Sequence, residues 1–220
     1  MKLEEYKCEI ELIEKQNNVE YDLYTVVASV LKERKPFKTI SLRFVGHCRR
    51  TQKAKKKVFW ALRGFPDFVV LDKQYKPVEK SIDKSMIYGT VEVKGVGLPI
   101  LESNDDRLQL VGHLLWFDKV IYTNGYEWRF YRNIWTANDD EVNKKQDISY
   151  KKYCKTPKNI EEEKMINEYL GKFDISELHY DSFILCKKVN DKRKWDNKEW
   201  DKLIKYLDKY NFVNLEKTEK

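Results

Sequence analysis

The sequence predicts an α/β protein in which strands and amphipathic helices share one core. Residues 37–48, 66–72 and 86–94 are β-prone runs with the length and pattern of strands. Two further β-prone runs are separated by Asn124-Gly125, a dipeptide typical of a tight hairpin. Apolar residues recur at helical spacing over residues 20–34, in a stripe made of Leu23, Val26, Val27, Val30 and Leu31.

Other amphipathic segments predict helices around these strands. They cover residues 3–16, 104–118 and 156–171, and a last helix begins near Asp196. The chain becomes mostly polar over residues 133–155, so we expect a loop or an irregular insert there. The helices that follow this insert predict a C-terminal helical appendage.

A chain of 220 residues is long enough for one sizeable core and a small appendage. We therefore expect a core domain over residues 1–134 and an α-rich extension packed on it over residues 135–220. No apolar run approaches the roughly 18 residues of a membrane span, and the first residues lack the apolar stretch of a secretion signal. These absences predict a cytoplasmic protein without membrane contact.

Charge and cysteine usage restrict the partners. The formal net charge of +7 favours a polyanion as the partner. The four cysteines are too far apart in sequence for a Cys-x-x-Cys zinc knuckle, and we expect reduced thiols.

Two basic patches are candidates for nucleic-acid contact. The run 49–57 contains no acidic residue, and a second patch with a tryptophan precedes the last helix. Lysine and arginine release counterions from nucleic-acid phosphates. The candidate contacts are Arg49, Arg50, Lys53, Lys55, Lys56, Lys57, Lys192, Arg193 and Lys194. A solvated helix face is the competing interpretation of the first run.

Glu92 and Lys94 are the most informative pair of residues for chemistry. They are two positions apart on a predicted strand, so both side chains emerge on one face, about 6–7 Å apart along it. Asp67 opens the preceding strand, after Pro66, and Glu92 comes 25 residues later. The alternative interpretation makes Asp67 a turn residue and Glu92–Lys94 an ion pair that contributes less than about 1 kcal/mol. Only the strand register decides whether Asp67 meets Glu92.

An Asp at the entry of one strand, followed by Glu-x-Lys on the next, resembles the PD-(D/E)XK nuclease superfamily. Residues 64–132 add a glutamine-bearing helix and a Thr-Asn-Gly-x-x-Trp-Arg hairpin in the order found in nuclease domains of type I restriction enzyme motor subunits. The resemblance implies a restriction-endonuclease-like fold, with a mixed central sheet flanked by helices. It also implies Mg²⁺- or Mn²⁺-dependent hydrolysis of phosphodiester bonds, most simply in DNA.

The resemblance assigns a role to each candidate residue. Asp67, Glu92 and the backbone carbonyl of Val93 would bind the metal ion. Lys94 would orient the attacking water and offset negative charge, and Gln109 would position water or phosphate. Glu20 would supply an extra acid, although a solvated helix acid is the commoner interpretation of such a residue.

Residue usage and the resemblance suggest the biological setting. Lysine- and asparagine-rich usage favours an AT-rich genome, that of a bacterium or its phage, so we expect a bacterial cell or a phage-infected host and a role in defence or counter-defence. The chain has no Walker-type phosphate loop, so the nuclease would act alone, as a homodimer, or with a separate recognition or effector protein. One alternative is an inactive nuclease-fold protein that binds nucleic acid or inhibits a nucleic-acid enzyme, and a weaker one is a toxin that cuts RNA.

Overall fold

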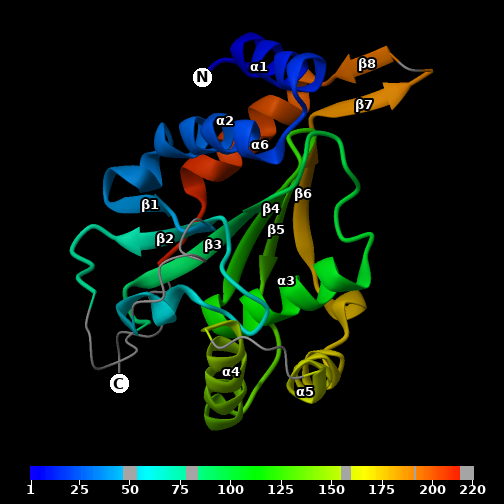
Figure 1. Ribbon diagram of the computed structural model, residues 1–220. Coiled ribbons are helices and arrows are strands. Elements are labelled where there is room, and N and C mark those ends of the chain that lie inside the picture. The colour runs from blue at the N-terminus through cyan, green and yellow to red at the C-terminus, as the bar shows by residue number, and fades with distance from the viewer. Residues whose placement is uncertain (47–53, 78–83, 155–159, 191, 214–220) are drawn as a thin grey trace.

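A six-stranded mixed sheet forms the centre of the computed structural model, which describes residues 1–46, 54–77, 84–154, 160–190 and 192–213 (Figure 1). The β3–β4 pair is parallel, and all other neighbouring strands of this sheet are antiparallel. The strands follow one another across the sheet in chain order as β1 (Ile40–Phe44), β2 (Phe68–Asp72), β3 (Ile87–Val93), β4 (Lys119–Thr123), β5 (Glu127–Arg132) and β6 (Tyr180–Ile184).

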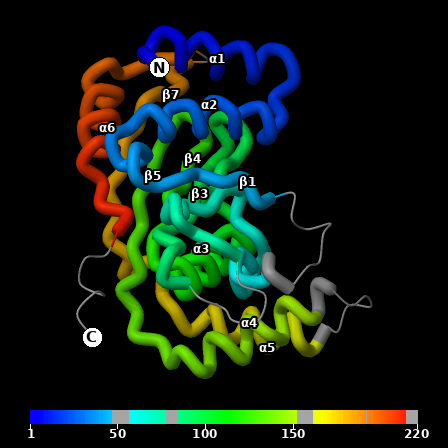
Figure 2. The backbone as a smooth tube through the Cα atoms, turned by 90° about the vertical axis from the view of Figure 1, so that its left-hand side faces the viewer, coloured from blue at the N-terminus to red at the C-terminus, as the bar shows by residue number. Residues whose placement is uncertain are grey.

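Helices cover both faces of this sheet (Figures 1 and 2). Helices α1 (Leu3–Gln16), α2 (Glu20–Lys32) and α6 (Asn197–Lys209) share one apolar core with the strands. Helix α3 (Asn104–Phe117) packs on the opposite face as the crossover between β3 and β4, with α4 (Asp139–Cys154) and α5 (Ile160–Leu170) beyond it. Single 3₁₀ turns are η1 (Lys35–Lys38), η3 (Ala54–Phe59) and η4 (Ile175–Glu177).

Alternation along β3 directs its side chains to two environments. Val91 and Val93 are fully buried in the core formed with α1, α2 and α6. Glu92 points to the other face, where its carboxylate lies 3.8 Å from Nδ1 of His113 on α3. Because successive strand residues face opposite ways, an apolar core and a polar site share the same strand. The predicted strands at 37–48, 66–72 and 86–94 are confirmed, with shorter bounds.

The Asn124-Gly125 hairpin is also confirmed. Asn124 Oδ1 accepts hydrogen bonds from the backbone N–H groups of Tyr126 and Glu127, over 2.9 and 2.8 Å. Gly125 has a φ of +81°, a left-handed conformation that glycine adopts without steric cost. The Tyr6 hydroxyl donates to the Gly125 carbonyl over 2.7 Å, which attaches α1 to this turn.

The expectation of a loop over residues 133–155 is wrong, because residues Asp139–Cys154 form helix α4. The buried stripe of α4 is partly polar, and apolar periodicity therefore does not reveal it. Gln146 donates to the backbone carbonyls of Lys57 and Trp60, and Ser149 donates to that of Leu62. These hydrogen bonds attach α4 to the segment that precedes β2.

The C-terminal third contributes more than the helical appendage that the sequence predicts. Strand β6 extends the main sheet by pairing with β5. The chain then forms a two-stranded hairpin, β7 (Cys186–Val189) and β8 (Lys192–Trp195), before α6 closes the core. Among the described residues, no helix has the length and apolar character needed to cross a membrane.

Candidate active site

Strand register brings Asp67 and Glu92 together. Strands β2 and β3 pair antiparallel, with Phe68 opposite Val91. Continuing that register by one residue sets Asp67 opposite Glu92, and directly opposed residues project from the same face of a sheet. Both side chains are buried, with 5% and 4% of their surface exposed.

Two hydrogen bonds hold the Asp67 carboxylate. The Tyr24 hydroxyl on α2 lies 2.6 Å from Oδ1, and the backbone N–H of Val93 donates to Oδ2 over 2.8 Å. Burial raises the pKa of Asp67 to about 6, although both hydrogen bonds oppose this shift. The carboxylate is therefore fixed in orientation but carries an unfavourable charge, which a nearby cation would stabilise.

Glu20 lies at the same site. Its Oε1 is 2.9 Å from the Tyr24 hydroxyl, and its charge contributes to the raised pKa of Asp67. A tyrosine hydroxyl has one proton, so Tyr24 donates to only one of the two carboxylates at a time. The structure thus brings the sequence-predicted extra acid to Asp67 through a shared tyrosine.

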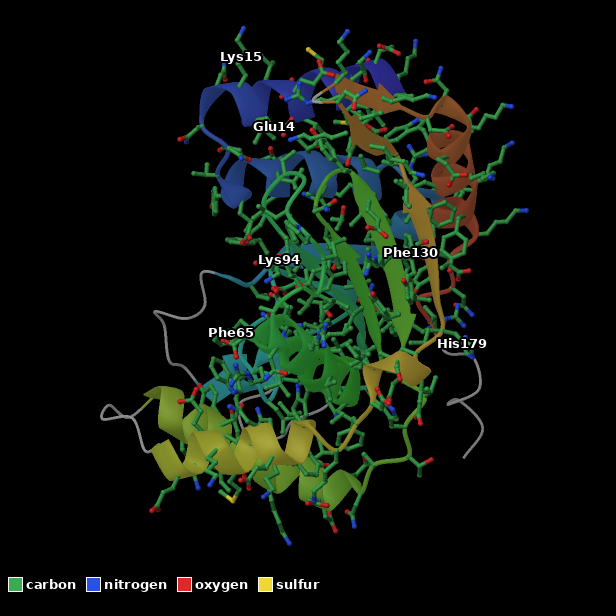
Figure 3. All side chains as sticks on the ribbon, turned by 90° about the vertical axis from the view of Figure 1, so that its right-hand side faces the viewer. Glu14, Lys15, Phe65, Lys94, Phe130 and His179 are labelled. Carbon is green, nitrogen blue, oxygen red and sulfur yellow. The ribbon has the colours of Figure 1, made fainter. Side chains whose placement is uncertain are left out.

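Lys94 is surrounded by acceptors at the end of β3 (Figure 3). Its Nζ lies 2.9 Å from Asp106 Oδ1, 3.8 Å from Glu92 Oε1 and 3.4 Å from Gln109 Oε1. Burial opposes the ammonium form, but Glu92 and Asp106 outweigh it and raise the pKa of Lys94. Lys94 therefore carries its proton at neutral pH and acts as a positive charge and hydrogen-bond donor.

Tyr24 and Asp106 are site residues that the sequence pattern did not identify. Asp106 lies one helical turn before Gln109, so the two side chains share a face of α3. Burial opposes the Asp106 carboxylate, but hydrogen bonds from Lys94 and Ser103 lower its pKa, and the Ser103 hydroxyl donates over 2.7 Å. Helical spacing was a detectable signal for both, because Asp106 lies three residues before Gln109 and Tyr24 lies four residues after Glu20.

His113 and Tyr122 form the buried wall of the site. His113 Nδ1 lies 3.8 Å from Glu92 Oε2, and the Lys94 ammonium lies 5.7 Å from the centre of the Tyr122 ring. Burial raises the pKa of Tyr122, and the charges of Glu92 and Asp106 add to this shift. The Tyr122 hydroxyl therefore remains protonated beside the carboxylates.

The donor atoms suit a hard divalent cation. Asp67 and Glu92 offer carboxylate oxygens, and Val93 offers a backbone carbonyl, which are ligand types that Mg²⁺ takes. Within the described ranges, no three His, Cys, Asp or Glu side chains form a metal-binding group by themselves. A magnesium ion commonly uses one or two protein carboxylates and completes its shell with water and substrate phosphate, so this donor set fits it chemically.

The predicted nucleic-acid contacts have different positions. Arg49, Arg50 and Lys53 lie outside the described residues, as do the side chains of Lys55 and Lys56. Lys57 forms an ion pair with Asp147 of α4. Lys192, Arg193 and Lys194 lie on β8, where Arg193 bonds to Glu14 of α1 over 2.5 Å.

The polar cluster therefore belongs to an α/β domain and joins residues of α2, β2, β3 and α3. It contains four carboxylates, those of Glu20, Asp67, Glu92 and Asp106, around the ammonium of Lys94. Comparison of the chain with protein-family models, curated proteins and solved structures finds no match.

Proposed function

We propose that this protein is a metal-dependent nuclease that hydrolyses phosphodiester bonds, with DNA as its substrate. The observation that carries the proposal is the β2–β3 register, which sets Asp67 opposite Glu92 with Lys94 Nζ 3.8 Å from the Glu92 carboxylate. The mixed sheet between helices supports the restriction-endonuclease-like fold that the resemblance implies. Mg²⁺ or Mn²⁺ would be held by Asp67, Glu92 and the carbonyl of Val93.

Each side chain has a defined task in this proposal. A bound divalent ion would neutralise charge on the scissile phosphate and lower the pKa of the attacking water. Lys94 donates hydrogen bonds as an ammonium, so it orients that water and stabilises the negative charge that develops on the phosphate. Gln109, 3.4 Å from Lys94, positions water or phosphate from α3.

Tyr24 and the Val93 backbone preorganise the first carboxylate. Their hydrogen bonds use one lone pair on each oxygen of Asp67 and leave further lone pairs for a cation. Asp106 lies closer to Lys94 than Glu92 does, and so it holds the ammonium near α3. Preorganised charges of this kind need no rearrangement at the moment of reaction.

The same contacts favour a second candidate function. Both Asp67 oxygens already accept hydrogen bonds, and Lys94 is paired with Asp106 without any metal. A cluster whose charged groups are already paired and hydrogen-bonded without a metal also suits an inactive nuclease-fold protein that binds nucleic acid or inhibits a nucleic-acid enzyme.

Incubation with several substrates separates the two functions. Plasmid, linear duplex, single-stranded DNA and RNA are each incubated with the protein and Mg²⁺, Mn²⁺ or EDTA. A nuclease that acts on DNA cuts it with either metal and does not cut it in EDTA. Preferential cleavage of RNA would instead identify an RNA-cutting enzyme. Absence of cleavage by the folded protein in all conditions would leave the binding function.

Glu92→Gln is the decisive variant, because it removes the negative charge while keeping the shape of the side chain. We expect it to abolish metal-dependent cleavage. The matched control is Glu168→Gln on α5, which changes an exposed carboxylate that pairs only with Lys164 in the described structure. Cleavage by Glu92→Gln at the control rate would exclude the proposed site.

A further inference from the structure

The β7–β8 hairpin presents a row of lysines on one face. Its register sets Lys187 opposite Lys194 and Val189 opposite Lys192. Opposed pairs two residues apart share a face of a hairpin, so these four side chains lie together. All four are exposed. Like charges directly opposite one another destabilise a hairpin, so this arrangement is unfavourable without an anionic partner.

The other face of the hairpin is attached to the protein. Lys188 and Arg193 both bond to Glu14 of α1, over 3.0 and 2.5 Å, and Figure 3 labels Glu14 on that helix. Glu14 is almost buried, with 8% of its side chain exposed. By contrast, the described structure contains no ion pair of Lys187, Lys192 or Lys194. The anchored face thus holds the hairpin rigid while its outer face keeps its positive charge.

A groove of about 450 Å³ runs from this lysine face to the free edge of β6, with Ser182, Ile184, Lys187 and Lys194 in its lining. Two acids also line it, but both are engaged by α6. Asp196 accepts the N–H groups of Lys198 and Glu199 as the cap of that helix. Glu199 pairs with Lys202 over 2.7 Å. Lys187 and Lys194 are therefore the charged side chains of the lining that have neither an ion pair nor a helix-capping hydrogen bond in the described structure.

The groove lies at the edge of β6, at the same end of the sheet as the candidate active site, and Ser182 in its lining projects from the same face as Glu92. The registers align Glu92, Tyr122, Arg129 and Ser182 in one row across β3 to β6. Three strand spacings of about 4.8 Å separate the ends of this row by about 14 Å. Ser182 lines the groove, so one nucleic-acid strand can extend from the candidate site to the groove.

We infer that the lysine face of the β7–β8 hairpin, made of Lys187, Lys192 and Lys194, binds the phosphate backbone of DNA to one side of the bond that is cut. This inference rests on the proposed nuclease function. It replaces Arg193, which is paired with Glu14 on the other face of the hairpin, by Lys187 in the set of nucleic-acid contacts. These contacts fix the position of the substrate and carry no sequence information, because they go to phosphates.

The test measures binding without cleavage. Fluorescence anisotropy of a labelled DNA duplex is recorded in EDTA over a salt series, for the full chain and for the double variant Lys187→Gln/Lys194→Gln. We expect about a tenfold or larger loss of affinity and a salt slope about two units shallower, because two phosphate contacts are lost. The control is Lys144→Gln, an exposed lysine on α4 at the opposite end of the molecule, which should bind as wild type (Figure 1).

Unchanged affinity and salt slope in the double variant would overturn the inference. A loss of binding to polyglutamate with unchanged binding to DNA would also overturn it, and would assign the face to an acidic protein. Both lysines are exposed and repel each other, so the melting temperature of the double variant should equal that of wild type or exceed it slightly. The proposed nuclease function fails separately, through absence of Mg²⁺-dependent cleavage by wild type, because the binding test uses no metal.

Discussion

Tyr24 and Asp67 are 43 residues apart in the chain, and the Tyr24 hydroxyl lies 2.6 Å from Asp67 Oδ1. The same hydroxyl lies 2.9 Å from Glu20, so it separates two carboxylates that would otherwise repel each other directly. This contact joins the N-terminal end of α2 to the entry of β2.

Replacing Tyr24 by Phe should raise the pKa of Asp67 above its value of about 6, since the hydrogen bond lowers that pKa. Loss of a charge-assisted hydrogen bond should also reduce the free energy of unfolding by about 1–3 kcal/mol. Carboxyl NMR titration and urea denaturation measure the two effects. Tyr206→Phe, which removes an exposed hydrogen bond to Asp181, is the control. An unchanged Asp67 pKa would contradict the role of Tyr24.

Lys94→Ala should reduce the rate of DNA cleavage by about 100- to 1,000-fold, the usual effect of removing one donor from a developing negative charge. Lys94→Arg should recover only part of the rate, because a guanidinium cannot match the position of an ammonium held by Asp106. Single-turnover cleavage assays measure both variants, with Lys144→Ala as the control. Wild-type cleavage by Lys94→Ala would exclude the assigned chemistry.

Asp67→Asn should stabilise the metal-free protein at neutral pH. The raised pKa means that the folded state binds the Asp67 proton more tightly than the unfolded state, so its contribution to stability falls as pH rises from about 4 to about 6. We expect a gain of about 1–3 kcal/mol at pH 7.5 that shrinks towards pH 4. Urea denaturation in EDTA across this pH range provides the measurement, and a constant difference at all pH values would argue against the shift.

Mg²⁺ or Mn²⁺ should raise the melting temperature of the wild-type protein. A ligand at a hundred times its dissociation constant stabilises the folded state by about 2.7 kcal/mol, or about 5–10 °C for a chain of this size. Asp67→Asn and Glu92→Gln should lose this shift, while Glu168→Gln should keep it. Thermal denaturation with EDTA as the reference tests this, and equal shifts in all four proteins would place the ion elsewhere.

Glu14→Gln should loosen the β7–β8 hairpin. Burial opposes the Glu14 carboxylate, but hydrogen bonds from Tyr126, Lys188 and Arg193 lower its pKa. Its contribution is therefore present above the unfolded pKa of about 4.3 and is lost as pH falls through the lower folded value. We expect a loss of about 1–3 kcal/mol at pH 7.

Urea denaturation and hydrogen exchange of the hairpin amides measure the effect of Glu14→Gln. Glu4→Gln, which breaks an exposed helix pair with Lys7, should change stability by less than about 0.5 kcal/mol. Equal stabilities of Glu14→Gln and Glu4→Gln would show that Glu14 does not anchor the hairpin.

The local pattern of apolar and turn residues was sufficient to predict the elements whose buried face is apolar. The stripe of α2 and the Asn124-Gly125 turn are both where the sequence predicts them. Helix α4 was missed because Gln146 and Ser149, at buried positions, bond to the backbone of another segment. The apolar periodicity of the sequence cannot reveal such a helix, since hydrogen bonds to a distant segment stabilise it.

In the candidate site, too, local spacing predicts some features and the packing of distant segments decides others. The spacing of Glu92 and Lys94 is sufficient to place them on one face, because side chains alternate along every strand. The contacts of Tyr24 and Asp106 depend on how α2 and α3 dock at the ends of β2 and β3. Both residues lie one helical turn from a predicted site residue, but local spacing does not show that they contact Asp67 and Lys94.

The sequence by itself determined where β1 to β5 and most of the helices lie in the chain, the common face of Glu92 and Lys94, and the overall positive charge, since these follow from local spacing and composition. Only the tertiary structure decided that Asp67 faces Glu92, that Tyr24 joins Asp67 to Glu20, and that Arg193 pairs with Glu14. The reason is physical: strand register and helix docking are set by side-chain packing between segments distant in the chain, and a one-residue slip would send Asp67 to the opposite face.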